Sequence, residues 1–145
     1  PARDFQYIEI NRLLRRLHPT VVAQTEEKME ALGGRVRRDR ETDLLLVNDE
    51  FNVSLVLARC QRRDSGNLFW KVRLDTGLCP DLTVAVRLDA ANESALDYYL
   101  LPRLDIAVPR INLAERNSVE LENFRFDNLE YLYGMAARTR LRRAA

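Results

Sequence analysis

The sequence predicts an α+β domain with two N-terminal helices, a four- to five-stranded antiparallel meander, and a C-terminal helix packed on that sheet. Three observations support this prediction. Apolar residues recur at helical spacing up to Leu32, the period changes to two after Arg35, and Asp127-Asn128-Leu129-Glu130 has the form of a capping box. The 145 residues suit one domain over 1–145, and the first residue, Pro1, fits either removal of an initiator methionine or a fragment of a longer chain.

The two helices are expected at Phe5 to Leu17 and at Thr20 to Leu32. The polar face of the first helix carries three arginines, which are Arg12, Arg15 and Arg16. Pro19 ends the first helix and suits the first turn of the second, which stops at Gly33-Gly34. The chain therefore opens with a helical pair.

A hairpin is expected next, because the apolar runs Asp43 to Val47 and Phe51 to Cys60 are separated by the polar Asn48-Asp49-Glu50. Both alternating sets of the second run are apolar. Val56 and Leu57 should therefore be buried on opposite faces of a central strand, with helices covering each face.

Two later segments alternate as expected for strands of the meander. Leu68 to Asp75 places Trp70 inward, and Leu82 to Leu88 places Arg87 on the set opposite its large aliphatic residues. In Asn92 to Pro102 a turn followed by a strand is favoured over a helix capped by Asn92, and Arg103 to Asn117 is expected to be a surface connection or a short turn of helix. The terminal helix should run from Asn128 to about Arg140.

Composition excludes several function classes. With 46% hydrophobic and 31% charged residues the chain is neither collagenous, nor disordered, nor a small disulfide scaffold. The 23 basic and 22 acidic residues leave a net charge of +1, and no apolar run is long enough for a membrane span, so we expect no membrane partner. Two cysteines suggest a reducing, cytoplasmic compartment. The lone His18, the lack of a Cys-x-x-Cys pair and the lack of a P-loop argue against metal, cofactor and nucleotide sites.

Arginine is the more informative residue, because all but two of the 23 basic residues are arginine. Two groups form the candidate nucleic-acid-binding set: Arg35, Arg37, Arg38 and Arg40 around the first strand, and Arg138, Arg140, Arg142 and Arg143 near the C-terminus. Two interpretations of the second group stay open. One is contact with phosphate, and the other is compensation of a helix dipole together with a solvated tail.

The helix Thr20 to Leu32, the strands Asp43 to Val47 and Phe51 to Cys60, and the run Asp97 to Pro102 together resemble the order of elements in the restriction-endonuclease-like (PD-(D/E)xK) family. This resemblance implies an α/β/α core and Mg²⁺-dependent DNA cleavage. It assigns Asp43 as the first metal-binding acid; where the family has acid-x-Lys, this chain has Leu57-Ala58-Arg59. Pro80-Asp81 is another local match. Trp70 to Pro102 with Asp127 to Ala137 is also similar to uncharacterised proteobacterial proteins associated with mobile elements.

The sequence thus favours a non-catalytic DNA-associated or regulatory module of a bacterium, with arginines that contact phosphate and without enzyme activity. A protein-interaction or dimerising adaptor resembling bacterial secretion chaperones is the alternative. A divergent metal-dependent nuclease with Asp43 as its acid comes third. DNA, a protein partner or a second copy of the chain are the corresponding partners.

Overall fold

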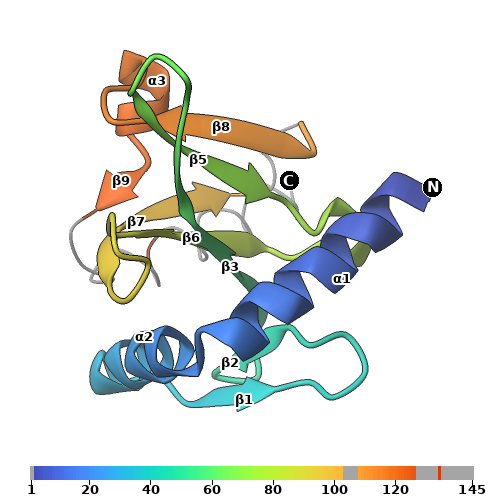
Figure 1. Ribbon diagram of the computed structural model, residues 1–145. Coiled ribbons are helices and arrows are strands. Elements are labelled where there is room, and N and C mark those ends of the chain that lie inside the picture. The colour runs from blue at the N-terminus through green and yellow to red at the C-terminus, as the bar shows by residue number, and fades with distance from the viewer. Residues whose placement is uncertain (1, 103–107, 127–133, 135–145) are drawn as a thin grey trace.

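Two helices open the chain in the computed structural model, which describes residues 2–102, 108–126 and 134 (Figure 1). Helix α1 covers Ala2–Leu17 and helix α2 covers Pro19–Ala31, which confirms the predicted pair. Pro19 lies in the first turn of α2, where its missing N–H breaks no helical hydrogen bond. Gly33 follows with φ of 90°, a left-handed value that glycine adopts without steric cost, and the chain then enters the sheet.

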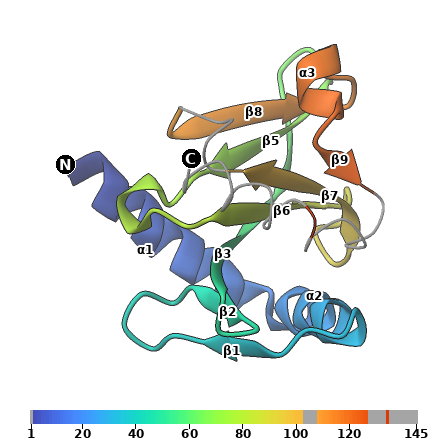
Figure 2. The same ribbon diagram turned by 180° about the vertical axis from the view of Figure 1, so that it is seen from behind.

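The main sheet has six strands in the order β1-β2-β3-β6-β7-β9 (Figures 1 and 2). Their bounds are Val36–Arg38 (β1), Leu45–Val47 (β2), Phe51–Ala58 (β3), Leu82–Leu88 (β6), Ala95–Pro102 (β7) and Arg125–Phe126 (β9). The β2–β3 hairpin is confirmed. Asn48 and Asp49 in its turn have φ of 54° and 55°, left-handed values that asparagine and aspartate tolerate.

The prediction of a wholly antiparallel meander is wrong at one pair of strands. β3 and β6 run parallel, from Val53 opposite Leu82 to Ala58 opposite Arg87, whereas the other pairs among the described strands are antiparallel. After β3 the chain leaves the main sheet and returns through the short 3₁₀ helix η1 (Thr76–Leu78) before β6 starts. A crossover of this kind brings the chain back to the end at which β3 began, so the two strands point the same way.

The crossover contains part of a second sheet with the order β4-β5-β8. Its strands are Cys60–Arg62 (β4), Leu68–Arg73 (β5) and Arg110–Ala114 (β8), followed by the short helix α3 (Val119–Glu122). The surface connection expected over residues 103–117 is thus partly a strand, in which buried Ile111 and Leu113 alternate with exposed neighbours. Only five residues long and preceded by Pro109, β8 gives a weak local signal.

The core has two parts, one on each face of β3. Leu57 belongs to a cluster with Leu14, Val21 and Met29 of the helices, whereas Val56 belongs to a cluster with Trp70 and other residues of the second sheet. Both residues are fully buried, as predicted. The expected cover is corrected, however: in the described part of the chain, helices cover one face and the three-stranded sheet covers the other, so the layers are not the α/β/α order that the resemblance implies (Figures 1 and 2).

The second sheet also buries Arg87, which lies on the face of β6 that carries fewer apolar residues. Arg87 is 2% exposed, and its Nη2 lies 2.6 Å from Oδ2 of Asp97, which is 1% exposed. The guanidinium stacks over the rings of Trp70 and Tyr99, at 4.5 Å and 5.4 Å from their centroids. Burial of Trp70 confirms its core role, and its Nε1 donates to the Leu88 carbonyl oxygen at 2.8 Å.

The predicted helix from Asn128 to about Arg140 lies outside the described residues, apart from Gly134. The same holds for Arg138, Arg140, Arg142 and Arg143. In the part of the chain that is described, no helix has the length and apolar character that crossing a bilayer requires.

Candidate nucleic-acid interface

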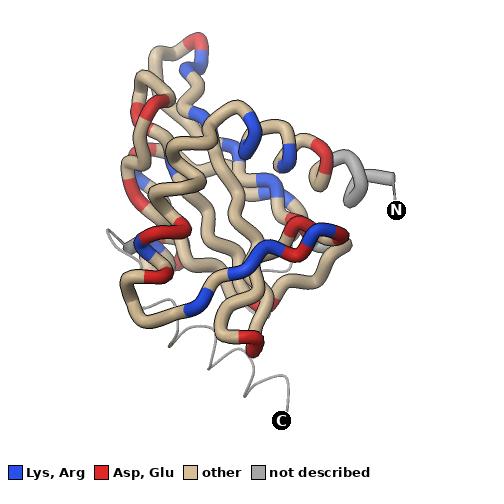
Figure 3. Tube along the Cα trace, turned by 90° about the horizontal axis from the view of Figure 1, so that it is seen from below, with Lys and Arg blue, Asp and Glu red and all other residues tan. Residues whose placement is uncertain are grey.

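The four arginines predicted around the first strand lie at one edge of the main sheet, where β1 is the outermost strand. Arg37 and Arg38 belong to β1, Arg35 precedes it, and Arg40 lies in the loop that follows. Basic and acidic segments alternate along this edge and its loop (Figure 3). Each arginine must therefore be considered together with its acidic neighbours.

Arg35 and Arg37 share one carboxylate, Asp49 of the β2–β3 turn. Nη2 of Arg37 lies 2.9 Å from Oδ1 of Asp49. The side chains of Arg35 and Arg37 are 78% and 68% exposed, so water screens these pairs strongly. Both guanidinium groups can exchange Asp49 for another anion at little cost.

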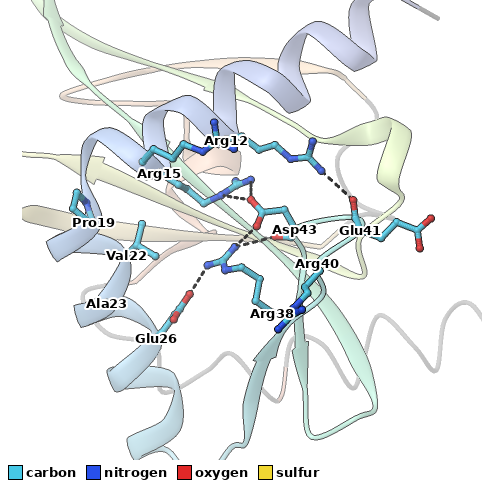
Figure 4. Close-up of a pocket in the computed structure, with 11 residues that line it drawn as sticks. Arg12, Arg15, Pro19, Val22, Ala23, Glu26, Arg38, Arg40, Glu41 and Asp43 are labelled. Atoms are coloured by element: carbon cyan, nitrogen blue, oxygen red, sulfur yellow. Dashed lines mark hydrogen bonds and ion pairs between the residues drawn. The ribbon is translucent and has the colours of Figure 1, made fainter.

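Arg38 points to the helical side of the sheet and is half-buried. It is ion-paired with Glu26 of α2, and its Nη1 lies 3.1 Å from Oδ1 of Asp43. Asp43 in turn accepts from Arg15 of α1, whose Nε is 3.0 Å from Oδ2. We call Arg15, Asp43, Arg38 and Glu26 the ion-pair chain; Figure 4 shows it crossing from α1 to α2 through the loop before β2.

Asp43 is held in place by both its backbone and its side chain. Its φ is 64°, and its N–H donates to the Asp39 carbonyl oxygen at 2.8 Å. Burial of the carboxyl group favours its neutral form, but hydrogen bonds and charges from Arg15 and Arg38 outweigh burial and lower the pKa of Asp43 below its ordinary value. Asp43 is therefore a carboxylate already neutralised by two guanidinium groups.

The ion-pair chain lies in the wall of a pocket of about 550 Å³ (Figure 4). We call it the basic pocket. It is lined by the arginines Arg12, Arg15, Arg16, Arg38 and Arg40, the acids Glu26, Glu41 and Asp43, and Pro19, Val22 and Ala23 of α2. Arginines thus outnumber acids in its wall, which makes the pocket suited to an anion.

Two of these arginines have no ion-pair partner among the described residues. Arg16 and Arg40 are exposed and form no ion pair with any described residue. Arg12 differs, because its Nη2 donates to the Glu41 carbonyl oxygen at 3.1 Å and it pairs with Glu9. Arg16 and Arg40 are therefore the guanidinium groups most available to a ligand of the basic pocket.

A second hollow of about 580 Å³ adjoins the basic pocket, since Arg38 and Arg40 line both. Arg37 also lines it, with Leu46 and Asn52. Arg37, Leu46 and Asn52 are register partners across β1, β2 and β3. We use the name basic strip for Arg16, Arg40, Arg37 and Arg35, which follow one another from the end of α1 to the sheet edge along the hollows that they line.

The residues that the resemblance assigns to Mg²⁺ do not fit a divalent cation. Such a cation needs converging oxygen ligands, and the Asp43 oxygens already accept from arginines. Leu57 is buried in the core, and Arg59 is exposed beyond the end of β3. Asp81 binds elsewhere, because its Oδ2 accepts from the Asn52 N–H at 2.9 Å. Across residues 2–102 and 108–126, no group of three or more His, Cys, Asp or Glu residues could hold a metal.

The sequence points to Asp43 and to the arginines around β1, but it does not mark Arg12, Arg15 and Arg16 as residues of the same site. The signal was present, since these three arginines occupy one face of an amphipathic helix at spacings of three and four. What the sequence lacked was the direction in which that face points. Packing of α1 on β3 aims it at the loop that carries Arg40 and Asp43.

No family model matches this chain, and no curated protein sequence matches it. The fold is similar to that of a bacterial homing endonuclease, I-Ssp6803I. The two structures superpose with a TM-score of 0.54 and 15% sequence identity, over 88% of this chain and 94% of the endonuclease chain. The similarity therefore extends over nearly the whole fold. At this identity the comparison shows a similarity of fold alone.

Proposed function

We propose that this protein is a DNA-associated module that holds a duplex without cutting it, built on a fold similar to that of a homing endonuclease. The structural similarity to a homing endonuclease supports a scaffold suited to a nucleic-acid strand. The observation that supports the absence of cleavage is the pairing of Asp43 with Arg15 and Arg38. With its acid neutralised and Leu57 in the core, the site does not assemble a metal-bound nucleophile.

The basic strip is the proposed contact surface for phosphates. Arginine binds phosphate through a planar fork of N–H donors, and such contacts do not depend on base sequence. Arg35 and Arg37 can leave Asp49 readily because their pairs are exposed, and Arg16 and Arg40 have no carboxylate partner among the described residues. Arg138, Arg140, Arg142 and Arg143 complete the proposed set from the C-terminal segment.

A fluorescence-anisotropy titration of a labelled duplex at several salt concentrations tests this function. Each neutralised phosphate contributes a log–log slope of about −0.9, so three or four contacts give roughly −3. Replacing the four C-terminal arginines by alanine, and separately the strip arginines by glutamine, shows which group carries the slope. If no duplex binds even at about 50 mM salt, where phosphate contacts are strong, the DNA function fails and the adaptor function takes its place.

A further inference from the structure

The charges of the basic pocket divide into a paired set and an available set. Glu26 and Asp43 are neutralised within the ion-pair chain. Arg15 is fixed further by donating from Nη1 to the Leu55 carbonyl oxygen at 2.7 Å. The available set is Arg16 and Arg40, opposed only by the Glu41 side chain in the same wall. The pocket thus combines a charge-balanced ion-pair chain in its wall with two guanidinium groups that have no ion-pair partner among the described residues.

The two arginines come from different elements. Arg16 is in the last turn of α1, and Arg40 is in the loop between β1 and β2. Both line the same pocket, whose volume of about 550 Å³ is that of a small-molecule site and leaves room for a phosphate with the sugar that carries it. Two guanidinium groups on one phosphate make charge-assisted hydrogen bonds, the stronger kind.

We propose that the basic pocket binds one phosphate group of a nucleic-acid strand through Arg16 and Arg40, and that this binding requires no divalent cation. The inference rests on the proposed function and names the subsite that it uses. Arg15 and Arg38 supply the positive charge beside Asp43 that a metal ion would supply in a metal-dependent nuclease. A divalent cation would therefore weaken binding, because it competes for the phosphate and finds no ligand set in this pocket.

The test compares the double variant Arg16→Gln/Arg40→Gln with Arg110→Gln/Arg116→Gln. The control removes the same charge from two exposed arginines on and after β8 that pair with no described residue. With pyrophosphate as the probe, ¹⁵N-edited NMR of arginine side chains should show shifts of Arg16 and Arg40 in the wild type. We expect the pocket variant to bind pyrophosphate at least about tenfold more weakly, since the loss of one charge-assisted hydrogen bond weakens binding by roughly that factor. The affinity of the control variant should change less than about twofold.

The duplex gives the second measurement. With EDTA present, wild-type binding should persist, and the pocket variant should lose one phosphate contact, which makes the log–log slope about 0.9 shallower. Binding that appears only with Mg²⁺ would overturn the inference. So would a pocket variant that binds both pyrophosphate and duplex like the control; if duplex still bound in that case, the proposed function would stand with its contacts elsewhere. Pyrophosphate binding at Arg16 and Arg40 without duplex binding would instead remove the DNA function and keep the phosphate site.

A competition experiment identifies which phosphate the pocket takes. Closed circular duplex offers internal phosphodiesters only, whereas a short duplex with 5′-phosphates offers strand ends as well. Equal competition per phosphate assigns the pocket to the backbone. Competition that needs the 5′-phosphate, and that is lost in the pocket variant, assigns it to a strand end. Failure of both competitors against bound pyrophosphate contradicts the inference.

Discussion

Arg15 on α1 and Asp43 before β2 form an ion pair in which Arg15 Nε lies 3.0 Å from Asp43 Oδ2. The same guanidinium donates to the carbonyl oxygen of Leu55 in the central strand. One side chain therefore joins the first helix, a loop and the middle of the sheet. It also occupies the position beside the carboxylate that a catalytic metal ion would need.

The first prediction is that the purified protein does not cleave DNA. Supercoiled plasmid incubated with Mg²⁺ or Mn²⁺ should remain supercoiled, because Asp43 is neutralised by Arg15 and Arg38 and no group of three or more possible metal ligands forms among the described residues. Agarose-gel electrophoresis against a metal-dependent nuclease checks this. Cleavage that disappears in Asp43→Ala would show that the ion pair opens to admit a metal.

The second prediction concerns Asp43→Asn, which keeps a side chain tolerant of the left-handed φ of 64°. The variant should lose about 1–3 kcal/mol of unfolding free energy at neutral pH, because Arg15, with only 8% of its side chain exposed, loses its counter-ion. Asp49→Asn is the matched control: it too has a positive φ and two arginine partners, but these are exposed, so its loss should stay below about 1 kcal/mol. Equal losses in urea denaturation would contradict this.

The difference in unfolding free energy between the wild type and Asp43→Asn should depend on pH, because the pKa of Asp43 is lowered in the folded protein. A carboxyl group whose pKa is lower in the folded state binds fewer protons there than in the unfolded chain. Its stabilising contribution is therefore complete above the ordinary aspartate pKa and is lost as the pH falls through the lowered value. The gap in unfolding free energy between wild type and Asp43→Asn should close at acid pH, which denaturation at a series of pH values measures.

The third prediction concerns the buried pair of Arg87 and Asp97, whose side chains are 3% and 1% exposed. Asp97→Asn should cost about 3–5 kcal/mol, because it leaves a guanidinium buried without its charge partner. Arg87→Met combined with Asp97→Leu should be less destabilised than Asp97→Asn alone, since no buried charge is then left unpaired. Arg125, which also pairs with Asp97, is exposed and keeps Glu122 as a partner. If the double variant has a lower unfolding free energy than Asp97→Asn, the attraction between the two charges stabilises the fold by more than the cost of burying them.

The fourth prediction uses Val56 and Leu57, adjacent residues in different core clusters. Leu57→Ala should cost about 2–4 kcal/mol and Val56→Ala about 1–3 kcal/mol, from lost burial plus the cavity that each leaves. Methyl NMR separates the two faces. Leu57→Ala should shift signals of Val21 and Met29, and Val56→Ala those of Val72 and Leu113. Shifts confined to one face for both variants would disprove the assignment of the clusters.

Local features of the sequence determined several elements of this protein. Helical spacing and Pro19 determine the first two helices, and the polar break after Val47 determines the β2–β3 hairpin. Apolar residues in both alternating sets of β3 determine that Val56 and Leu57 are buried on opposite faces. These features are readable because backbone periodicity and turn chemistry act over a few neighbouring residues.

Only the tertiary structure decided the direction of β6, the formation of the second sheet, and which arginines form ion pairs. The parallel β3–β6 pair and strand β8 depend on hydrogen bonds between residues far apart in the chain, which leave no local period. Arg87 resembles a surface residue until the alignment of β6 with β7 places Asp97 beside it. The sequence also shows many arginines around one acid, but long-range packing determines which of them form ion pairs. Arg15 and Arg38 pair with Asp43, whereas Arg16 and Arg40 have no such partner among the described residues. The reason is that an ion pair forms only where folding brings opposite charges within a few ångströms.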